Sequence, residues 1–172
     1  MGFVLNQMRI SGRDALPLIE GGKGIAVSNG ESSGAWAATG GAGTFSGVNA
    51  DSRDDDGEMV FQDYLGRTRR DRHDELIAHA VRGAIFQART AYEISNGAGP
   101  IHMNILWEMG GAERVLHGAL QGAHGLIDGV TCGAGMPYKV AEITASYGVY
   151  YYPIVSSARA FRALWKRAYH KF

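Results

Sequence analysis

The chain has 172 residues, and 45% of them are hydrophobic. This length fits one domain, and the apolar share is enough for a packed core and too high for a disordered chain. Lys+Arg and Asp+Glu both number 17, so the formal net charge is zero. Because nucleic-acid and anionic-membrane surfaces need a basic excess, the composition argues against both kinds of partner. We expect a single domain over residues 1–172.

Cysteine content and the start of the chain bear on the compartment. Cys132 is the one cysteine in the sequence, so an intrachain disulfide is impossible and a reducing compartment is expected. Residues 1–14 lack the apolar core of a secretory signal, and Gly2 is not followed by a myristoylation pattern. No stretch approaches the roughly 18 consecutive apolar residues of a membrane span. These features favour a cytoplasmic protein.

The first expected elements are short and lie between glycine clusters. Residues 16–19 have the pattern of a short buried strand, which runs into the glycines of 21–24. Ser32 or Ser33 can cap a helix that stops at the next glycine pair. Residues 44–48 predict a second, weaker strand. Glycine after a strand lets a ligand approach the backbone closely, so these exits are candidate parts of a binding site.

A polar, irregular insertion at 49–66 precedes the strongest helix. The acidic run at 54–56 fits a solvated turn better than a calcium loop, because the spacing of oxygen ligands is wrong. Between residues 76 and 92, apolar residues recur at three- and four-residue steps and form one stripe, and residues 96–100 stop the segment. The basic residues of this segment fall mostly outside the stripe, so we interpret them as a solvated helix face rather than a phosphate or RNA site.

Strand and helix pairs then follow at a regular pitch. Strands are predicted at 101–106, 126–131 and 149–155, a unit of about two dozen residues. Pro137 suits the first position of a helix, and Ser156 or Ser157 can cap the last one. The expected inner face of that last helix consists of Phe161, Leu164, Trp165, Ala168 and Tyr169.

This alternation predicts βαβ units around a parallel sheet, that is, an α/β fold. Right-handed crossovers place all strand carboxyl ends on one side, so Asn104, Cys132 and Ser156 should meet there. Active sites of (β/α)8 TIM barrels lie on that face. About five βα units are present, and a closed barrel needs eight. An open flavodoxin-like sheet is the alternative, although the long connection at 49–100 argues against it.

Five segments, in this order, resemble motifs of the nitronate monooxygenase family, formerly called 2-nitropropane dioxygenases. The first two resemble its first strand with the flavin-contacting loop and its helix-end motif before the second strand. The others resemble its third-strand asparagine motif and its fourth- and fifth-strand exits. The segments are 17–25, 37–43, 102–106, 132–137 and 152–160. Each motif is weak alone, and together they cover nearly the whole chain.

The resemblance implies a TIM barrel that binds FMN non-covalently. The family oxidises alkyl nitronates with O₂ to carbonyl compounds and nitrite, and related members are flavin-dependent enoyl-acyl-carrier-protein reductases. By position, Gly22 and Gly24 would let backbone approach the isoalloxazine ring, and Asn104 would hydrogen-bond it. Gly133 and Ser156 would line the same mouth.

Two departures from the family pattern stand out. The family usually carries Pro-Met where this chain has Gly22 and Lys23. Lys23 could place positive charge near the flavin and stabilise its anionic reduced form, or it points to solvent or pairs with Glu20. The second departure is larger. The family's Ala-Gly-Gly-His segment, with its proposed catalytic base, and its last phosphate-binding loops fall beyond residue 172, so no catalytic residue is assigned.

Several single residues are candidates to replace the family's catalytic base. His102 lies two positions before Asn104 and so points to the same side of its strand; we interpret it as a satisfied core histidine rather than a base. Cys132 is interpreted as a small buried or pocket-wall residue, because a redox nucleophile needs a partner and none is evident. No metal site is predicted. Surface or flanking positions on helices are expected for His73, His79 and His117.

The functional hypothesis is an FMN-dependent oxidoreductase that oxidises a nitronate-like carbon acid with O₂. A second hypothesis, from a different class, is a non-catalytic half-barrel that pairs its open sheet edge with another copy or a companion chain. A third is an enoyl reductase that consumes NADH or NADPH.

Overall fold

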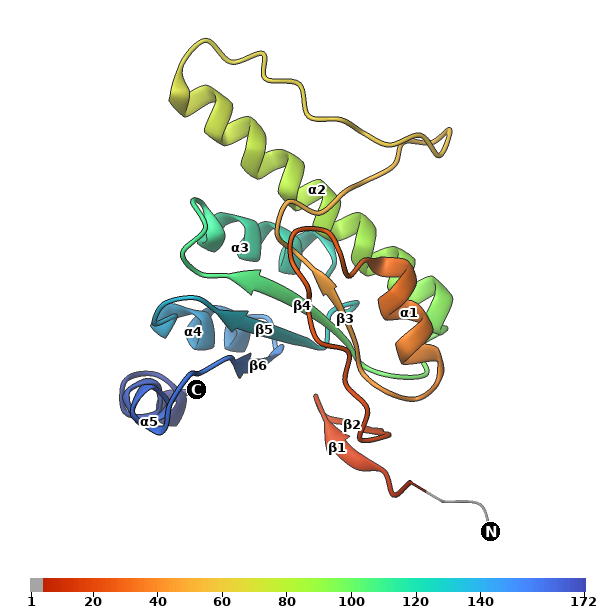
Figure 1. The fold of residues 1–172 in the computed structure, drawn as a ribbon, viewed down its shortest axis with the longest axis vertical. Coiled ribbons are helices and arrows are strands. Elements are labelled where there is room, and N and C mark those ends of the chain that lie inside the picture. The colour runs from red at the N-terminus through yellow and green to blue at the C-terminus, as the bar shows by residue number, and fades with distance from the viewer. Residues whose placement is uncertain (1–4) are drawn as a thin grey trace.

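The computed structural model describes residues 5–172 (Figure 1). Residues 1–4, on which the absence of a secretory signal and of a myristoylation pattern partly rests, lie outside the described residues. Among the helices of the described part, none combines the length and apolar content that crossing a bilayer requires.

Alternating helices and strands follow a short N-terminal hairpin. Strands β3, β4, β5 and β6 form one sheet in that order, and all three pairings are parallel, whereas β1 and β2 pair antiparallel. The elements are β1 (Met8–Ile10), β2 (Arg13–Ala15), α1 (Gly30–Ala38), β3 (Gly43–Ser46), α2 (Arg69–Ser95), β4 (Ile101–Leu106), α3 (Ala112–Gly122), β5 (Gly129–Gly133), α4 (Tyr138–Ser146), β6 (Tyr150–Pro153), α5 (Ala158–Arg167) and the 3₁₀ turn η1 (Tyr169–Lys171).

The segment after β2 occupies the place of a further strand beside β3. Ile19 forms a parallel bridge with Ala42, and the Leu18 carbonyl accepts a 2.8 Å hydrogen bond from the Ala42 amide. The expectation of a buried strand at 16–19 was wrong, because Leu18 and Ile19 are 39% and 52% exposed. The bridge nevertheless places the segment next to the sheet, so five strand segments each precede a helix.

One face of the sheet packs against α2, α3 and α4 and forms the main core. Alternate side chains of β3, β4 and β5 point to this face, as the period of a strand requires. Burying each large apolar side chain contributes about 1.5–3 kcal/mol. The sheet residues in this core are Phe45, Ile101, Met103, Ile105, Val130 and Cys132.

The opposite face of the sheet is polar, and the N-terminal hairpin covers its amino end. Ser11, in the β1–β2 turn, lies 2.7 Å from His102 Nε2 through its Oγ, and its backbone N–H donates to the Tyr152 hydroxyl at 2.9 Å. The rings of His102 and Tyr152 stack with centroids 4.9 Å apart. These contacts hold the hairpin against the amino end of β4 and leave the carboxyl end for the loops.

The connection from β3 to α2 is long, and α2 extends beyond the sheet. Within residues 49–68 the only regular pairing is an isolated bridge between Arg53 and Met59. Thr68 caps α2, since its side chain accepts from the Asp71 amide. Figure 1 shows that the N-terminal half of α2 projects past the other helices and that the connection runs beside it.

Several predicted element boundaries shift in the structure. Asn29, rather than Ser32 or Ser33, caps α1, because its Oδ1 accepts a 2.9 Å hydrogen bond from the Ser32 amide. Pro137 is the N-cap of α4 and not its first helical residue, and Ser157 is the N-cap of α5. Strand β5 covers 129–133 instead of 126–131.

The predicted inner face of α5 was only partly correct. Leu164 and Ala168 are buried, as expected, but Phe161 and Trp165 are 45% and 52% exposed. Tyr169 stacks on Tyr151, whereas Phe161 and Trp165 pack mainly on each other and on Tyr169, and the helical period alone could not show that the stripe would stay half exposed.

Candidate functional site

The candidate site lies at the carboxyl edge of the sheet, on its polar face. Ser46 of β3 is opposite Asn104 of β4, which in turn is opposite Thr131 of β5. Side chains directly opposite one another in neighbouring strands share a face and lie within contact distance. The register therefore gathers two hydroxyls and one amide in a row at the end of three strands.

The glycine segment after the first strand lies directly against this row. A Cβ added to Gly22 would meet Asn104 Cγ at 2.7 Å, so only glycine allows the backbone to lie where it does. A Cβ on Gly24 would be 3.9 Å from Ser46 Oγ, an ordinary contact. The loop itself is closed by Ser28, whose Oγ accepts from the Lys23 amide at 2.8 Å and whose carbonyl accepts from the Ser46 amide at 2.8 Å.

Asn104 is held in one orientation by its neighbour on β5. Thr131 Oγ1 donates to Asn104 Oδ1 at 3.0 Å, and Asn104 is 4% exposed. This hydrogen bond occupies the amide oxygen and directs the amide nitrogen away from Thr131. Among residues 5–172 no hydrogen bond engages that nitrogen, so its two donors are free for a ligand.

Glu20 and Lys23 do not form the pair that the sequence left open. Glu20 is 4% exposed; its carboxylate accepts from Ser32 Oγ at 3.0 Å and from the Thr44 amide at 3.1 Å. It joins the loop, α1 and β3 and has a structural role. Lys23 is exposed and forms no salt bridge within the described residues. Its ammonium group is therefore in solvent, beside the carboxyl edge of the sheet.

Gly133 and Ser156 lie at the exits of the next two strands, farther from Asn104. Gly133 ends β5 opposite Leu106, and its carbonyl accepts from the Trp107 amide at 3.0 Å. Ser156 is exposed and follows β6 by three residues. The structure thus brings Gly22 and Asn104 into contact, places Gly24 near the same row, and leaves Gly133 and Ser156 along the same edge without mutual contact.

Sequence reasoning missed Thr131 and Ser46 at this site. The strand period gave a signal for Thr131, because it lies two residues before Gly133 and so points to the same face of β5. Ser46 could be placed on that face only once β3 is aligned with β4, where it pairs with Asn104. The missing information was the register between strands, which no single strand carries in its own sequence.

The expectation that Cys132 meets Asn104 and Ser156 at the candidate site was wrong, because its side chain points to the other face of the sheet. Its side chain is fully buried on the helix-covered face of β5. Burial raises the pKa of the thiol to about 12, so the reactive thiolate is not populated near neutral pH. The residue is a packing element, as the alternative interpretation held.

The histidines supply no base at this edge. His102 does share the face of Asn104, but it is 1% exposed at the amino end of β4, and burial lowers its pKa to about 4. His79, expected at the surface, is instead only 7% exposed on α2. No group of three or more His, Cys, Asp or Glu side chains within residues 5–172 is placed to hold a metal ion.

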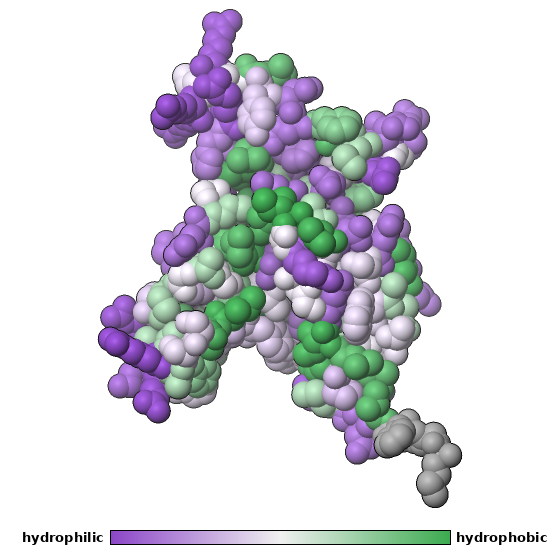
Figure 2. Space-filling view, viewed as in Figure 1, coloured by the Kyte–Doolittle hydropathy of each residue, from purple (hydrophilic) through white to green (hydrophobic). Residues whose placement is uncertain are grey.

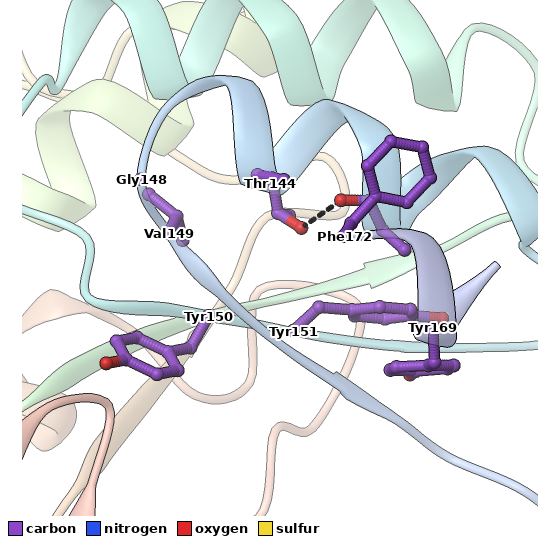
Figure 3. A pocket seen from close by; sticks show the side chains of 9 residues that line it. Thr144, Gly148, Val149, Tyr150, Tyr151, Tyr169 and Phe172 are labelled. Atoms are coloured by element: carbon purple, nitrogen blue, oxygen red, sulfur yellow. Dashed lines mark hydrogen bonds between the residues drawn. The ribbon is translucent and has the colours of Figure 1, made fainter. Parts of the chain in front are cut away.

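A cavity of about 390 Å³ lies at the opposite end of β6, away from the candidate site. Figure 3 shows Tyr151 and Tyr169 with parallel rings, 5.3 Å apart, on one side of the strand, while Tyr150 points to the other side. Desolvation raises the pKa of both stacked hydroxyls, so each stays neutral. The side chains that line this pocket are uncharged, and packing accounts for Tyr151 here and for Tyr152 on the other face of the sheet, where it stacks on His102.

The groups at the carboxyl edge suit the ring of a flavin. A planar heterocycle with carbonyl and imide groups needs neutral hydrogen-bond donors and a surface without side chains, and Asn104 beside Gly22 offers both. The described residues of the mouth contain no fixed cation for a phosphate, which TIM barrels bind with the loops after their seventh and eighth strands.

Comparison with known proteins bears on the fold. No family model and no curated protein matches the chain. Among solved structures it is similar to FabK from Thermotoga maritima, a TIM barrel, with a TM-score of 0.54 at 19% sequence identity. This chain has the fold of an incomplete TIM barrel. The match covers 88% of this chain and 37% of that chain, so this chain spans little more than a third of the length of FabK.

Proposed function

We propose that this chain is the N-terminal part of an FMN-dependent oxidoreductase related to the nitronate monooxygenases. Support comes from the five family-like motifs and from the likeness to FabK, which is a flavin-dependent enoyl-acyl-carrier-protein reductase of the 2-nitropropane dioxygenase type. The buried, unpaired Cys132 fits a reducing compartment such as the cytoplasm.

One observation carries the proposal. The glycine loop after the first strand segment contacts the asparagine of β4, and the hydrogen bond from Thr131 occupies the amide oxygen of Asn104 while its amide nitrogen has no hydrogen-bond partner among residues 5–172. Residues from three strand segments thus build one donor-bearing surface at the edge where barrels of this type place their sites.

The role of these residues is to bind and orient the flavin. FMN, when bound, would supply the chemistry, since it accepts an electron pair from the substrate and is reoxidised by O₂. Asn104 would donate from its amide nitrogen to a carbonyl of the ring, and Thr131 would keep that nitrogen directed at it. Gly22 and Gly24 would let the ring approach the loop backbone, and the exposed Lys23 would add positive charge beside it.

No described residue is placed to act as the catalytic base. His102 is sealed under the hairpin and stays neutral at physiological pH. We therefore assign this chain a share of the flavin site and assign none of its described residues to proton abstraction from a nitronate-like carbon acid.

An enoyl reductase is the second candidate reaction, and the likeness to FabK favours it. Nitrite release and O₂ consumption with an alkyl nitronate would identify the oxidase, whereas NADH or NADPH oxidation that requires an unsaturated thioester would identify the reductase. Both reactions require bound flavin and differ in their substrates. The two assays therefore distinguish the reactions, and either result is compatible with the proposed FMN binding.

The non-catalytic half-barrel is the alternative from another class. The outer edge of β6 and the outer side of 16–20 pair with no strand among residues 5–172. Ile25, Val27 and Ile154 are more than 60% exposed, and Figure 2 shows a hydrophobic area at the centre of one face, where Figure 1 places the segment between β2 and α1. Such surfaces fit a companion chain or a second copy that completes the barrel.

Direct titration tests the flavin proposal. Purified protein is mixed with FMN, and the flavin fluorescence and the absorbance bands are followed to saturation. Binding with one flavin per chain, or per assembled barrel as measured by light scattering, is the expected result. Asn104→Leu, which keeps the size of the side chain and removes its donors, should weaken binding at least tenfold. Absence of binding by every oligomeric form would refute the flavin site and leave the half-barrel role.

A further inference from the structure

A second cavity lies far from the carboxyl edge of the sheet, between the β3–α2 connection (residues 49–68) and the projecting N-terminal half of α2. Its volume is about 370 Å³, within the range of small-ligand pockets. The connection contributes residues 60–63 and Leu65, and α2 contributes Glu75, Ala78, His79 and Arg82. Figure 1 shows these two segments running beside each other at the end of the molecule. We call this cavity the helix–loop crevice.

Three polar atoms in the helix–loop crevice are buried without a hydrogen-bond partner. They are Gln62 Nε2, Glu75 Oε2 and His79 Nδ1. His79 is 7% exposed and so is more than nine-tenths buried. Buried polar atoms in folded proteins are almost always paired, because an unpaired one loses its hydration without compensation. Three such atoms lining one cavity form a set of donors and acceptors that a polar ligand would satisfy.

The order of these groups along α2 defines the chemistry of that ligand. Glu75 and His79 are four residues apart, so they lie on one face about 6 Å apart along the axis, and Arg82 follows almost one turn later. The amide of Gln62 faces them from the connection. Along α2 the carboxylate of Glu75 is thus followed one turn later by the His79 ring and about two turns later by the Arg82 cation, and the connection adds the amide of Gln62 and the exposed carboxylate of Asp63.

The other wall of the helix–loop crevice is apolar and exposed. Phe61 and Leu65 are 77% and 84% exposed, and Val60 lies next to them. Large apolar side chains in a loop otherwise gain stability by turning inward. Their position opposite the polar row gives the crevice one hydrophobic side and one charged side.

We propose that the helix–loop crevice binds a small zwitterion with an apolar side chain, of the chemical class of a free apolar α-amino acid. The ammonium group donates to Glu75 Oε2, and the carboxylate accepts from Gln62 Nε2 and from His79 Nδ1–H. Arg82 attracts the carboxylate, and the side chain lies against Phe61 and Leu65. The two charges of an α-amino acid are close together, which fits partners spaced by one helical turn.

Matched probes that differ by one charge test the assignment. L-phenylalanine is titrated into the protein near neutral pH, without FMN, and heat is compared with that of phenethylamine and of 3-phenylpropionate, which lack the carboxylate and the ammonium group, respectively. Saturable binding of one phenylalanine per chain is expected, with both single-charge probes at least tenfold weaker. Equal binding of either single-charge probe, or no saturable heat at about 10 mM phenylalanine, overturns the proposal.

Variants locate the binding to the crevice. Glu75→Gln and Arg82→Gln should each weaken phenylalanine binding, the former at least tenfold. Glu93→Gln and Arg89→Gln remove the same charges from exposed positions on the same helix, outside the crevice, and should leave binding unchanged. Circular dichroism checks that each variant is folded. If Glu75→Gln binds phenylalanine as tightly as the unaltered protein, the ligand lies elsewhere and the proposal fails, whatever the outcome of FMN titration.

Discussion

The buried His102 should make the stability of this fold sensitive to acid. Its ring has one nitrogen 2.7 Å from Ser11 Oγ and the other unpaired, and it stacks on Tyr152 with 1% of its surface exposed. Burial lowers its pKa from 6.5 to about 4. Protonation therefore forces a positive charge into a site with no anion to receive it.

The sign and size of the effect follow from the two pKa values. Between pH 6.5 and 4 the unfolded chain binds more protons than the folded one, so the free energy of unfolding falls as the pH falls through this window. Above about pH 7.5, where the unfolded imidazole is also neutral, the group adds almost no pH dependence. The full loss is about 3.4 kcal/mol, and about 2.5 kcal/mol of it is reached by pH 4.5, a large part of the stability of a small domain.

Urea unfolding at pH 7.5 and 4.5 measures the change in the free energy of unfolding. Carboxylates also titrate in this range, so the contribution of the imidazole is obtained by comparing the unaltered protein with a variant that lacks His102. His102→Gln should lose about 2.5 kcal/mol less between the two pH values than the unaltered protein. Tyr152→Phe removes the hydroxyl that bonds to Ser11 but keeps the histidine, so it should retain the unaltered pH dependence. Equal pH dependence in His102→Gln and the unaltered protein would refute the argument.

Three further predictions concern the candidate site and the core. Gly22→Ala would bring a Cβ to 2.7 Å from Asn104 Cγ, so FMN affinity should fall at least tenfold in fluorescence titration; unchanged affinity would show that the loop does not contact the flavin. Thr131→Val removes the hydrogen bond to Asn104 Oδ1 and should weaken FMN binding about three- to tenfold, whereas Thr131→Ser should restore it; equal loss in both variants would point to packing instead of orientation. Cys132 should not react with a disulfide reagent in native buffer and should react fully in urea, because its thiol is buried with a raised pKa; rapid native labelling would contradict its placement on the helix-covered face.

Strands and helices with strong internal patterns were predictable from the sequence. Strand β4 occupies 101–106 as expected, because an apolar run after a Gly-Pro stop has few other options. The stripe of α2 and the series of strand and helix pairs likewise follow from spacing, and spacing implies a parallel sheet with its carboxyl ends on one side. The shared face of His102 and Asn104 followed from strand period alone.

Features that depend on a distant neighbour were not predictable in this way. Asn29 caps α1 in place of Ser32 because the chain before the helix is held by Ser28 on β3. His79 is buried because the connection lies over α2. Thr131 joins the site because the register of β5 on β4 sets it opposite Asn104.

Local pattern by itself therefore determined the alternation of elements, the parallel sheet and the side on which the carboxyl ends of its strands meet. These follow from the two periods of backbone structure and from chain handedness, which act within each segment. Only the tertiary structure decided that Gly22, Asn104 and Thr131 meet, that Cys132 turns to the helices, and that the aromatic residues of α5 stay exposed. Each of these depends on the register or packing of two segments distant in sequence, and no segment encodes the position of its partner.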